Sequence, residues 1–121
     1  MSYDLRIGVK VDGTDIMAVI DEPEYDSPTY NLGKMFRKCM GWDFTQGEWY
    51  KVSDVLPLIE NGVRELSINR KAYTQYDAPN GWGTTTSALR TLESLRDCIY
   101  GNVNGERGWQ AVPAEHLYMC W

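Results

Sequence analysis

The residues that could carry out chemistry are few and widely spaced. The chain has one histidine, His116, and three cysteines, Cys39, Cys98 and Cys120. On a strand His116 and Cys120 would share a face but lie about 13 Å apart, at roughly 3.3 Å per residue, too far for a nucleophile to contact its base. A single histidine with scattered cysteines also lacks the ligand spacing of a zinc site. No basic residue neighbours Cys120 in the sequence, so nothing there favours a thiolate. We predict no thiol chemistry and no metal site.

Pairs of carboxylates offer a second route to catalysis. Asp43 with Glu48, or Asp21 with Glu24, could supply an acid and a base for glycoside hydrolysis. Neither spacing is specific, because a chain with 17 acidic residues contains such pairs by chance. The sequence has no glycine-rich phosphate loop and no His-Glu-x-x-His motif. We therefore predict no catalytic residues, no cofactor and no enzyme activity.

Charge and aromatic content favour a protein partner over nucleic acid. The net charge is −5 and the pI is about 4.8, so a phosphate backbone would be repelled. The only basic concentration, Arg64, Arg70 and Lys71, is too small for a nucleic-acid surface. Five Trp and eight Tyr could instead serve a protein interface, where these residues are enriched, although they could equally fill the core.

Length and hydropathy indicate one domain covering residues 1–121. No apolar run approaches the ~20 residues of a membrane span, and no apolar block near Met1 resembles a signal peptide. We expect a cytoplasmic protein with reduced cysteines and no membrane partner. The sequence is compatible with a monomer or a homo-oligomer.

The elements that must position any site begin with an N-terminal hairpin. Strict alternation predicts strands over 3–11 and 14–21, joined by Asp12-Gly13 as a type I′ turn. That turn would place Val9 opposite Ile16, Ile7 opposite Ala18 and Leu5 opposite Ile20, giving a wholly apolar face. The last strand is expected over 116–121, beside the hairpin.

Three amphipathic stripes predict the helices that cover this hairpin. The first runs from an Asn31 N-cap to Met40 and ends at Gly41, and the second begins at a Ser53 N-cap. A further helical piece is expected over 69–76. The last helix is capped by Thr84, Thr85 or Thr86 and ends at Gly101. The expected fold is α+β, with a small antiparallel sheet, made of the N-terminal hairpin and the C-terminal strand, packed against three helices.

Candidate binding residues lie in two loops, where side chains are not committed to the core. The stretch 21–28 contains two prolines and four carboxylates, so it cannot form a helix or a central strand. The stretch 42–52 is aromatic and irregular, and could form a short hairpin or a packed loop. Trp82 is expected to plug a glycine-rich loop, with Trp82 and Trp109 as alternative contacts. We predict binding through Glu22, Glu24, Tyr25, Asp26, Trp49 and Tyr50.

Three runs carry a resemblance to a known group of proteins: Tyr30-Asn31-Leu32-Gly33-Lys34-Met35-Phe36, Gly41-Trp42-Asp43 and Asn80-Gly81-Trp82-Gly83-Thr84. With them, nearly the whole chain resembles small proteins encoded by bacteriophages and prophages. The resemblance brings no catalytic motif and no assigned residues. It implies a host bacterial cell as the setting, and action by binding a host protein or by sequestering a small signalling molecule.

The function expected from these features is stoichiometric binding of a host protein. A nucleic-acid-binding effector is a suitable partner, because an acidic surface can occupy its basic channel, as an inhibitor of bacterial defence such as an anti-CRISPR protein would. One alternative is a sponge for a nucleotide-like molecule, with Arg64, Arg70, Lys71, Tyr73 and Tyr76 as its candidate residues. Another is an accessory or structural phage protein.

Overall fold

The computed structural model describes residues 3–24, 30–79, 81 and 83–121 of the chain. Its strands are β1 (Arg6–Lys10), β2 (Met17–Asp21), β3 (Trp49–Lys51) and β4 (Leu117–Cys120). Its helices are α1 (Gly33–Met40), α2 (Val52–Ile68), the one-turn α3 (Arg70–Tyr73) and α4 (Thr85–Val103). Short 3-10 turns occupy Tyr30–Leu32, Thr74–Tyr76 and Ala114–His116.

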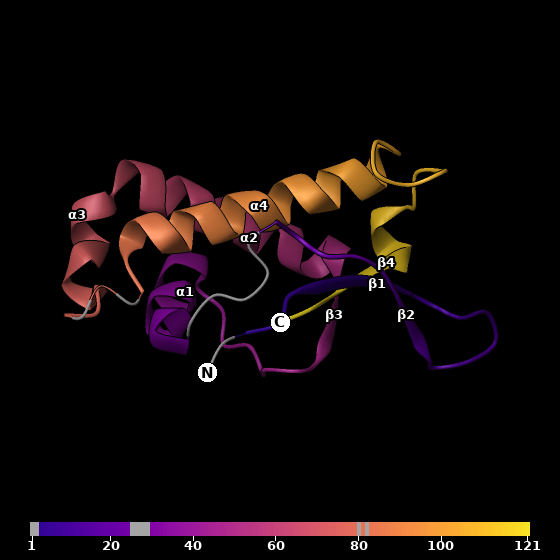
Figure 1. Cartoon of the computed structure of the whole chain (residues 1–121), viewed down its shortest axis with the longest axis horizontal. Coiled ribbons are helices and arrows are strands. Elements are labelled where there is room, and N and C mark those ends of the chain that lie inside the picture. The colour runs from indigo at the N-terminus through magenta and orange to yellow at the C-terminus, as the bar shows by residue number, and fades with distance from the viewer. Residues whose placement is uncertain (1–2, 25–29, 80, 82) are drawn as a thin grey trace.

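The strands form one antiparallel sheet in the order β2-β1-β4-β3. The helices lie together on one side of this sheet (Figure 1). The α+β class is confirmed, with the hairpin and the C-terminal strand in one sheet. The stretch 42–52, expected to form a short hairpin or a packed loop, contains the single strand β3, which pairs with β4 at the second margin of the sheet.

The core lies between the sheet and the helices. Ile7, Leu117 and Met119 of the central strands are fully buried, together with the apolar stripes of α1, α2 and α4. Many aromatic residues gather at one end of this core, where the Phe44 and Trp121 rings are 4.5 Å apart and the Phe36 ring is 5.2 Å from Trp121. Many of the aromatic side chains therefore fill the core, which was one of the two roles expected for them from the sequence.

The hairpin register differs from the predicted one by two residues. Val9 lies opposite Ala18, and Lys10 lies opposite Met17. The turn is longer than two residues, because the Val11 N–H donates to the Ile16 carbonyl at 2.8 Å and the Thr14 hydroxyl accepts from the Ile16 N–H at 3.1 Å. A threonine side chain that bonds the backbone in this way stabilises a wider turn, which the Asp-Gly pattern alone did not indicate.

A bulge also interrupts the hairpin near its open end. The register shifts between Ile7 and Gly8, so that Ile7 lies opposite Asp21 while Gly8 lies opposite Val19. Ile20 is therefore the extra residue on β2. Bulges of this kind increase the local twist and end regular pairing.

Two predicted helix boundaries are confirmed. Gly41 follows α1 with φ of 67°, the left-handed conformation that glycine adopts most easily. Thr84 caps α4, because its side chain accepts a hydrogen bond from the Ser87 N–H at 3.2 Å.

Three other boundaries were wrong. Asn31 does not cap α1, which begins at Gly33 after a 3-10 turn. Ser53 lies inside α2, which starts at Val52 directly after β3. Gly101 does not end α4, which continues to Val103. The Arg107 side chain packs on this glycine, and a Cβ there would meet its Cγ at 2.8 Å, so Gly101 serves close packing.

The layer arrangement predicts opposite effects for two isoleucines of the same hairpin. Ile7→Asp places an unpaired carboxylate in a fully buried position and should lower the free energy of unfolding by about 4 kcal/mol or more. Ile16→Asp changes a side chain that is 64% exposed and should leave stability within ~0.5 kcal/mol. Urea denaturation followed by circular dichroism measures both, and equal stability of the two variants would contradict the layer assignment.

Candidate functional site

The predicted acidic loop follows β2 directly. Glu22 and Glu24 are exposed, and Pro23 between them is buried. The Glu22 N–H donates to the Asp21 carboxylate at 2.8 Å, which fixes the start of the loop. Tyr25 and Asp26, the other two predicted residues here, lie outside the residues that the structure describes. The two glutamates therefore project from a fixed backbone, with their carboxylates in solvent.

The predicted aromatic pair belongs to β3 and is largely committed to packing. The Tyr50 ring lies edge-on to Trp42 at 5.0 Å, and its hydroxyl accepts from the Thr45 N–H at 2.6 Å. The half-buried Trp49 ring crosses the sheet to Gly8 of β1, where an added Cβ would meet it at 2.8 Å. Gly8 therefore leaves room for the indole.

The two predicted sets start from opposite margins of the sheet. Glu22 and Glu24 follow β2 at one margin, whereas Trp49 and Tyr50 form β3 at the other. The Trp49 indole extends from β3 toward the margin that carries Glu22 and Glu24. It packs on Gly8 of β1, and Gly8 pairs with Val19 of β2. Among the predicted residues that the structure describes, it does not bring Glu22 and Glu24 together with Trp49 and Tyr50.

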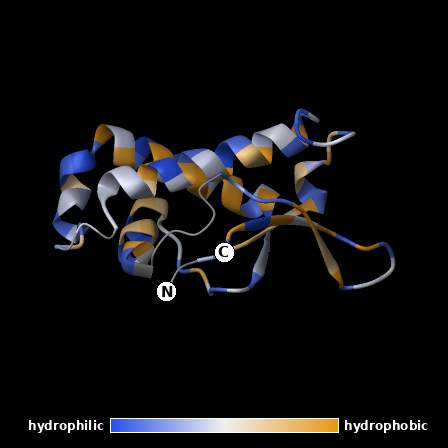
Figure 2. Ribbon diagram, viewed as in Figure 1, coloured by the Kyte–Doolittle hydropathy of each residue, from blue (hydrophilic) through white to orange (hydrophobic). Residues whose placement is uncertain are grey.

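A different group of residues gathers at the β2 margin. Val11 is 44% exposed, Ile16 64%, Val19 46% and Ile20 42%. We call these four residues the apolar edge. Figure 2 shows hydrophobic colour along β2 at the margin of the sheet. Sequence alternation had placed Ile16 and Ile20 on a covered face, which was wrong, because Ile16 lies before β2 at the turn and Ile20 lies at the bulge of this outermost strand, and both are exposed.

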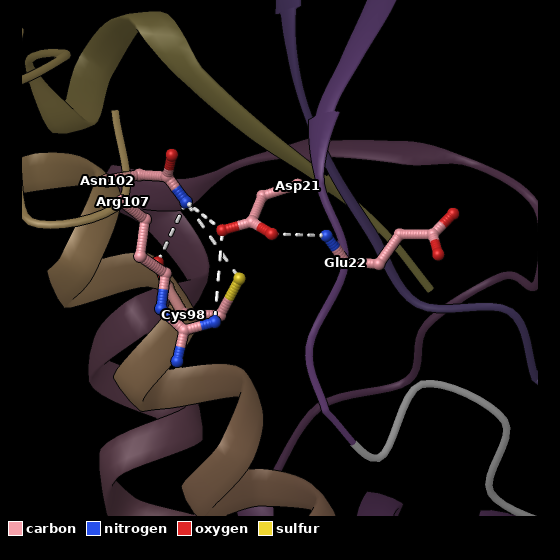
Figure 3. Close-up of polar contacts among 5 residues, drawn as sticks. All are labelled: Asp21, Glu22, Cys98, Asn102 and Arg107. Carbon is pink, nitrogen blue, oxygen red and sulfur yellow. Dashed lines mark hydrogen bonds and ion pairs between the residues drawn. The ribbon is translucent and has the colours of Figure 1, made fainter. Parts of the chain in front are cut away.

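A polar junction holds the end of β2 against α4 and the loop after it (Figure 3). The buried Asn102 side chain donates from Nδ2 to the Cys98 carbonyl at 2.9 Å and to Asp21 Oδ2 at 3.2 Å. The Arg107 guanidinium lies 3.9 Å from the same carboxylate oxygen, and its backbone N–H donates to the Gly101 carbonyl at 3.1 Å. Asp21 is thus part of a structural junction.

The same loop carries the most exposed tryptophan among the described residues. Trp109 is fully exposed. The Val112 N–H donates to the Asn102 carbonyl at 3.1 Å, so the loop is tied to α4 on both sides of Trp109. The sequence had named Trp109 as an alternative contact, and the other alternative, Trp82, lies outside the described residues.

The thiols of Cys39 and Cys98 are unreactive. Burial raises the pKa of Cys39 from 9.0 to about 12. Burial, followed by the nearby Asp21 carboxylate, raises the pKa of Cys98 to about 12 as well. A thiol with such a pKa is almost wholly protonated at neutral pH and a poor nucleophile.

The third thiol has a basic neighbour that the sequence did not indicate. Arg6 Nη2 lies 3.5 Å from Cys120 Sγ, and its guanidinium lies 5.8 Å from the centre of the Trp49 ring. The expectation that no cation adjoins Cys120 was wrong, because pairing of β1 with β4 brings Arg6 beside it. Cys120 is nevertheless fully buried beside β3, where Trp49 pairs with it, so reagents cannot reach it.

Among the described residues, no three His, Cys, Asp or Glu side chains come together as a metal site would require. His116 is exposed in the 3-10 turn before β4. Asp43, from the other carboxylate pair considered, accepts a hydrogen bond from Arg37 at 2.9 Å. In the described part of the chain, no helix is long and apolar enough to cross a membrane.

Two of the surface hollows contain more than one Lys or Arg residue. One, of about 460 Å³, lies beside α1 and is lined by Lys34, Arg37, Lys38, Gly41, Trp42 and Asp43. The other, of about 470 Å³, includes Arg70 and Lys71, but no aromatic ring lines it. Of the aromatic residues expected beside this cluster, Tyr73 donates to Glu65, and the Tyr76 ring lies 5.3 Å from Lys34 Nζ. Arg64 donates to Asn61 within α2.

Comparison with known protein families, with curated proteins and with solved structures finds no match for this chain.

The two raised pKa values predict a pH-dependent stability. The folded protein keeps the Cys39 and Cys98 protons where the unfolded chain, with thiol pKa near 9.0, loses them. The contribution of these thiols to stability is therefore complete below pH 9 and falls as pH rises from 9 toward 12. Cys39→Ala should flatten this decline in melting temperature measured from pH 8 to 11. Rapid labelling of Cys39 or Cys98 by a thiol reagent in the folded protein at pH 8 would contradict the assignment.

Proposed function

We propose that the protein acts by stoichiometric binding of another protein, through the apolar edge and the carboxylates beside it. The observation that carries this proposal is the position of the large exposed apolar residues. Among the described residues there are seven, and four of them, Val11, Ile16, Val19 and Ile20, form the apolar edge. Single exposed apolar residues are ordinary, whereas a group beside a free strand edge is typical of an interaction surface.

The charge around the apolar edge supports a basic partner. Residues 11–24 contain no Lys or Arg but five carboxylates. Asp15 lies 3.9 Å from Lys10, and Asp21 is held by Asn102 and Arg107, which leaves Asp12, Glu22 and Glu24 to face a partner. Opposite charge on a partner would speed the encounter and select the partner. A nucleic-acid-binding host effector presents such a basic surface. Inhibition of that effector, as by an anti-CRISPR protein, is the activity that this binding would produce in the phage setting that the resemblance implies.

Substitutions of the charged residues and of the apolar residues of this surface should change different rate constants of binding. The double variant Glu22→Lys, Glu24→Lys should slow association with a partner recovered from host lysate and weaken its salt dependence, because these exposed carboxylates act over long range. Ile16→Ser should leave association unchanged and speed dissociation by about tenfold or more, because it removes a contact formed only in the complex. Surface plasmon resonance at two salt concentrations measures both effects.

Ile68→Ser is the matched control for this experiment. Ile68 is also a large exposed apolar residue, at the end of α2. This variant should bind like the parent chain. If Ile68→Ser dissociates as fast as Ile16→Ser, or if neither the charge nor the apolar variant changes the kinetics, the proposed surface is wrong.

The hollow beside α1 supports a second candidate, a sponge for a nucleotide-like anion. Lys34, Arg37 and Lys38 line it together with Trp42, which combines cations for a phosphate with an indole for a base. One of these cations is already paired within the protein, since Arg37 lies 2.9 Å from the Asp43 carboxylate. The binding it offers is therefore weaker than three free cations would give.

Titration of the full chain with nucleotides, followed by tryptophan fluorescence, tests this second candidate. Binding should weaken about tenfold or more in Lys38→Glu, which reverses one charge in the hollow. Lys51→Glu, an equal charge change on β3 and outside both hollows, should bind as the parent does. The absence of any signal at millimolar nucleotide would exclude the sponge.

A further inference from the structure

The β2 margin offers unpaired backbone groups as well as apolar side chains. The Val11 N–H donates to the Ile16 carbonyl. In an antiparallel ladder the hydrogen-bonded pairs alternate with pairs that do not exchange hydrogen bonds. Counting from Val11 and Ile16, the pair Val9 and Ala18 is hydrogen-bonded, and the pairs of Met17 and Val19 are not. The N–H and C=O groups of Met17 and Val19 therefore point away from β1, to the open side of the sheet.

This margin has only part of the usual protection of an edge strand. Natural edges are shortened, or carry lysine or proline, so that other strands do not pair with them. The opposite edge follows this rule, because β3 has only three residues and includes Lys51. Residues 16–20 contain neither lysine nor proline. In the part of the chain that the structure describes, the bulge at Ile20 and the buried Pro23 after it limit pairing, and they leave Ile16 to Val19 regular.

We propose that β2 binds an extended segment of the partner as a fifth strand, and that this segment carries apolar residues flanked by Lys or Arg. The proposal rests on the protein-binding function above and adds its mode and the chemistry of its partner. Strand addition of this kind takes affinity from the backbone and specificity from alternate side chains. The regular edge is short, so about five residues of the partner would be enough.

The side chains of β2 determine what the added strand must present. Val19 lies opposite Gly8, and Met17 opposite Lys10, on the face of the sheet away from the buried Ile7 side chain. The Trp49 indole rests on Gly8 beside Val19 on this face, which also carries Lys10. Apolar residues of an added strand would pack against Val19. Lysine or arginine at its ends would meet Asp15 on one side and Glu22 on the other.

A second copy of this chain fits the edge poorly. Antiparallel pairing of two β2 strands about Ala18 would bring the acidic turn of one copy, with Asp12 and Asp15, toward the acidic end of the other, with Asp21 and Glu22. Like charges directly opposite one another destabilise a strand pair. Each copy also has a net charge of −5, which opposes association. The charge pattern therefore favours a different, basic chain as the occupant.

The test uses the full chain and a synthetic peptide, Lys-Lys-Ile-Thr-Val-Thr-Ile-Lys-Lys. On binding, amide hydrogen exchange at Met17 and Val19 should slow at least fivefold, with no change at Trp49 to Lys51. The same peptide with glutamate in place of lysine should bind at least tenfold more weakly. The variant Asp15→Lys, Glu22→Lys should reverse this preference, which a merely unfolded variant would not do.

Two further comparisons test separately whether binding needs the peptide's backbone hydrogen bonds and whether it needs the β2 edge. Peptides methylated on alternate backbone nitrogens can be made in two frames of equal composition. One frame removes the donors that face β2 and should lose binding, whereas the other should retain it. Val19→Lys should weaken binding at least tenfold while its melting temperature stays near that of the parent, and Ile68→Lys should have no effect on either quantity.

Three results would overturn strand addition. They are equal binding of the two methylated frames, no slowing of exchange at Met17 and Val19 at millimolar peptide, and slowing of the same amides by self-association of the chain alone. If a partner from lysate is still bound in Val19→Lys and lost in Trp109→Ala, strand addition fails and protein binding stands. If the chain forms no stoichiometric complex with any host protein, the proposed function itself fails.

Discussion

Burial of Ile7, Leu117 and Met119 under the helices is the interaction on which the rest of the structure depends. These residues belong to the two central strands, and each is fully buried. The helical cover is complete there and does not reach the margin, where Ile16 and Val19 are exposed. The hairpin carries more apolar surface than the helices can bury, so part of it faces water. This unequal cover, more than any chemical group, distinguishes the surface of the protein.

The polar junction at Asp21 explains how an uncovered strand can keep its place. Asn102 and Arg107 connect the end of β2 to α4, and the hydrogen-bonded turn at Thr14 closes its other end. β2 is therefore held at its two ends and along β1, without a helix above it. A strand fixed in this way loses little further conformational entropy when another strand pairs with it.

Periodicity in the sequence predicted the fold class, the hairpin and the main helices, because burial against a helix or sheet leaves a repeat of fixed period. It could not predict the hairpin register, since the Thr14 hydroxyl, and not the Asp12-Gly13 pair, sets the length of the turn. It also could not separate the apolar edge from the core. Ile7 and Ile16 have the same residue type and follow the same alternation, and only the strand order makes one buried and the other exposed. For the same reason Trp49 and Glu22 could not be assigned to different margins beforehand.

Amide hydrogen exchange of the unbound protein tests the central claim, that β2 is a free edge, most directly. Ala18 and Val9 pair with each other and should exchange slowly. Met17 and Val19 should exchange orders of magnitude faster, at rates independent of protein concentration, because their N–H groups face solvent. Slow exchange at all four positions would contradict the account, since it would mean that another segment or a second copy already covers the edge.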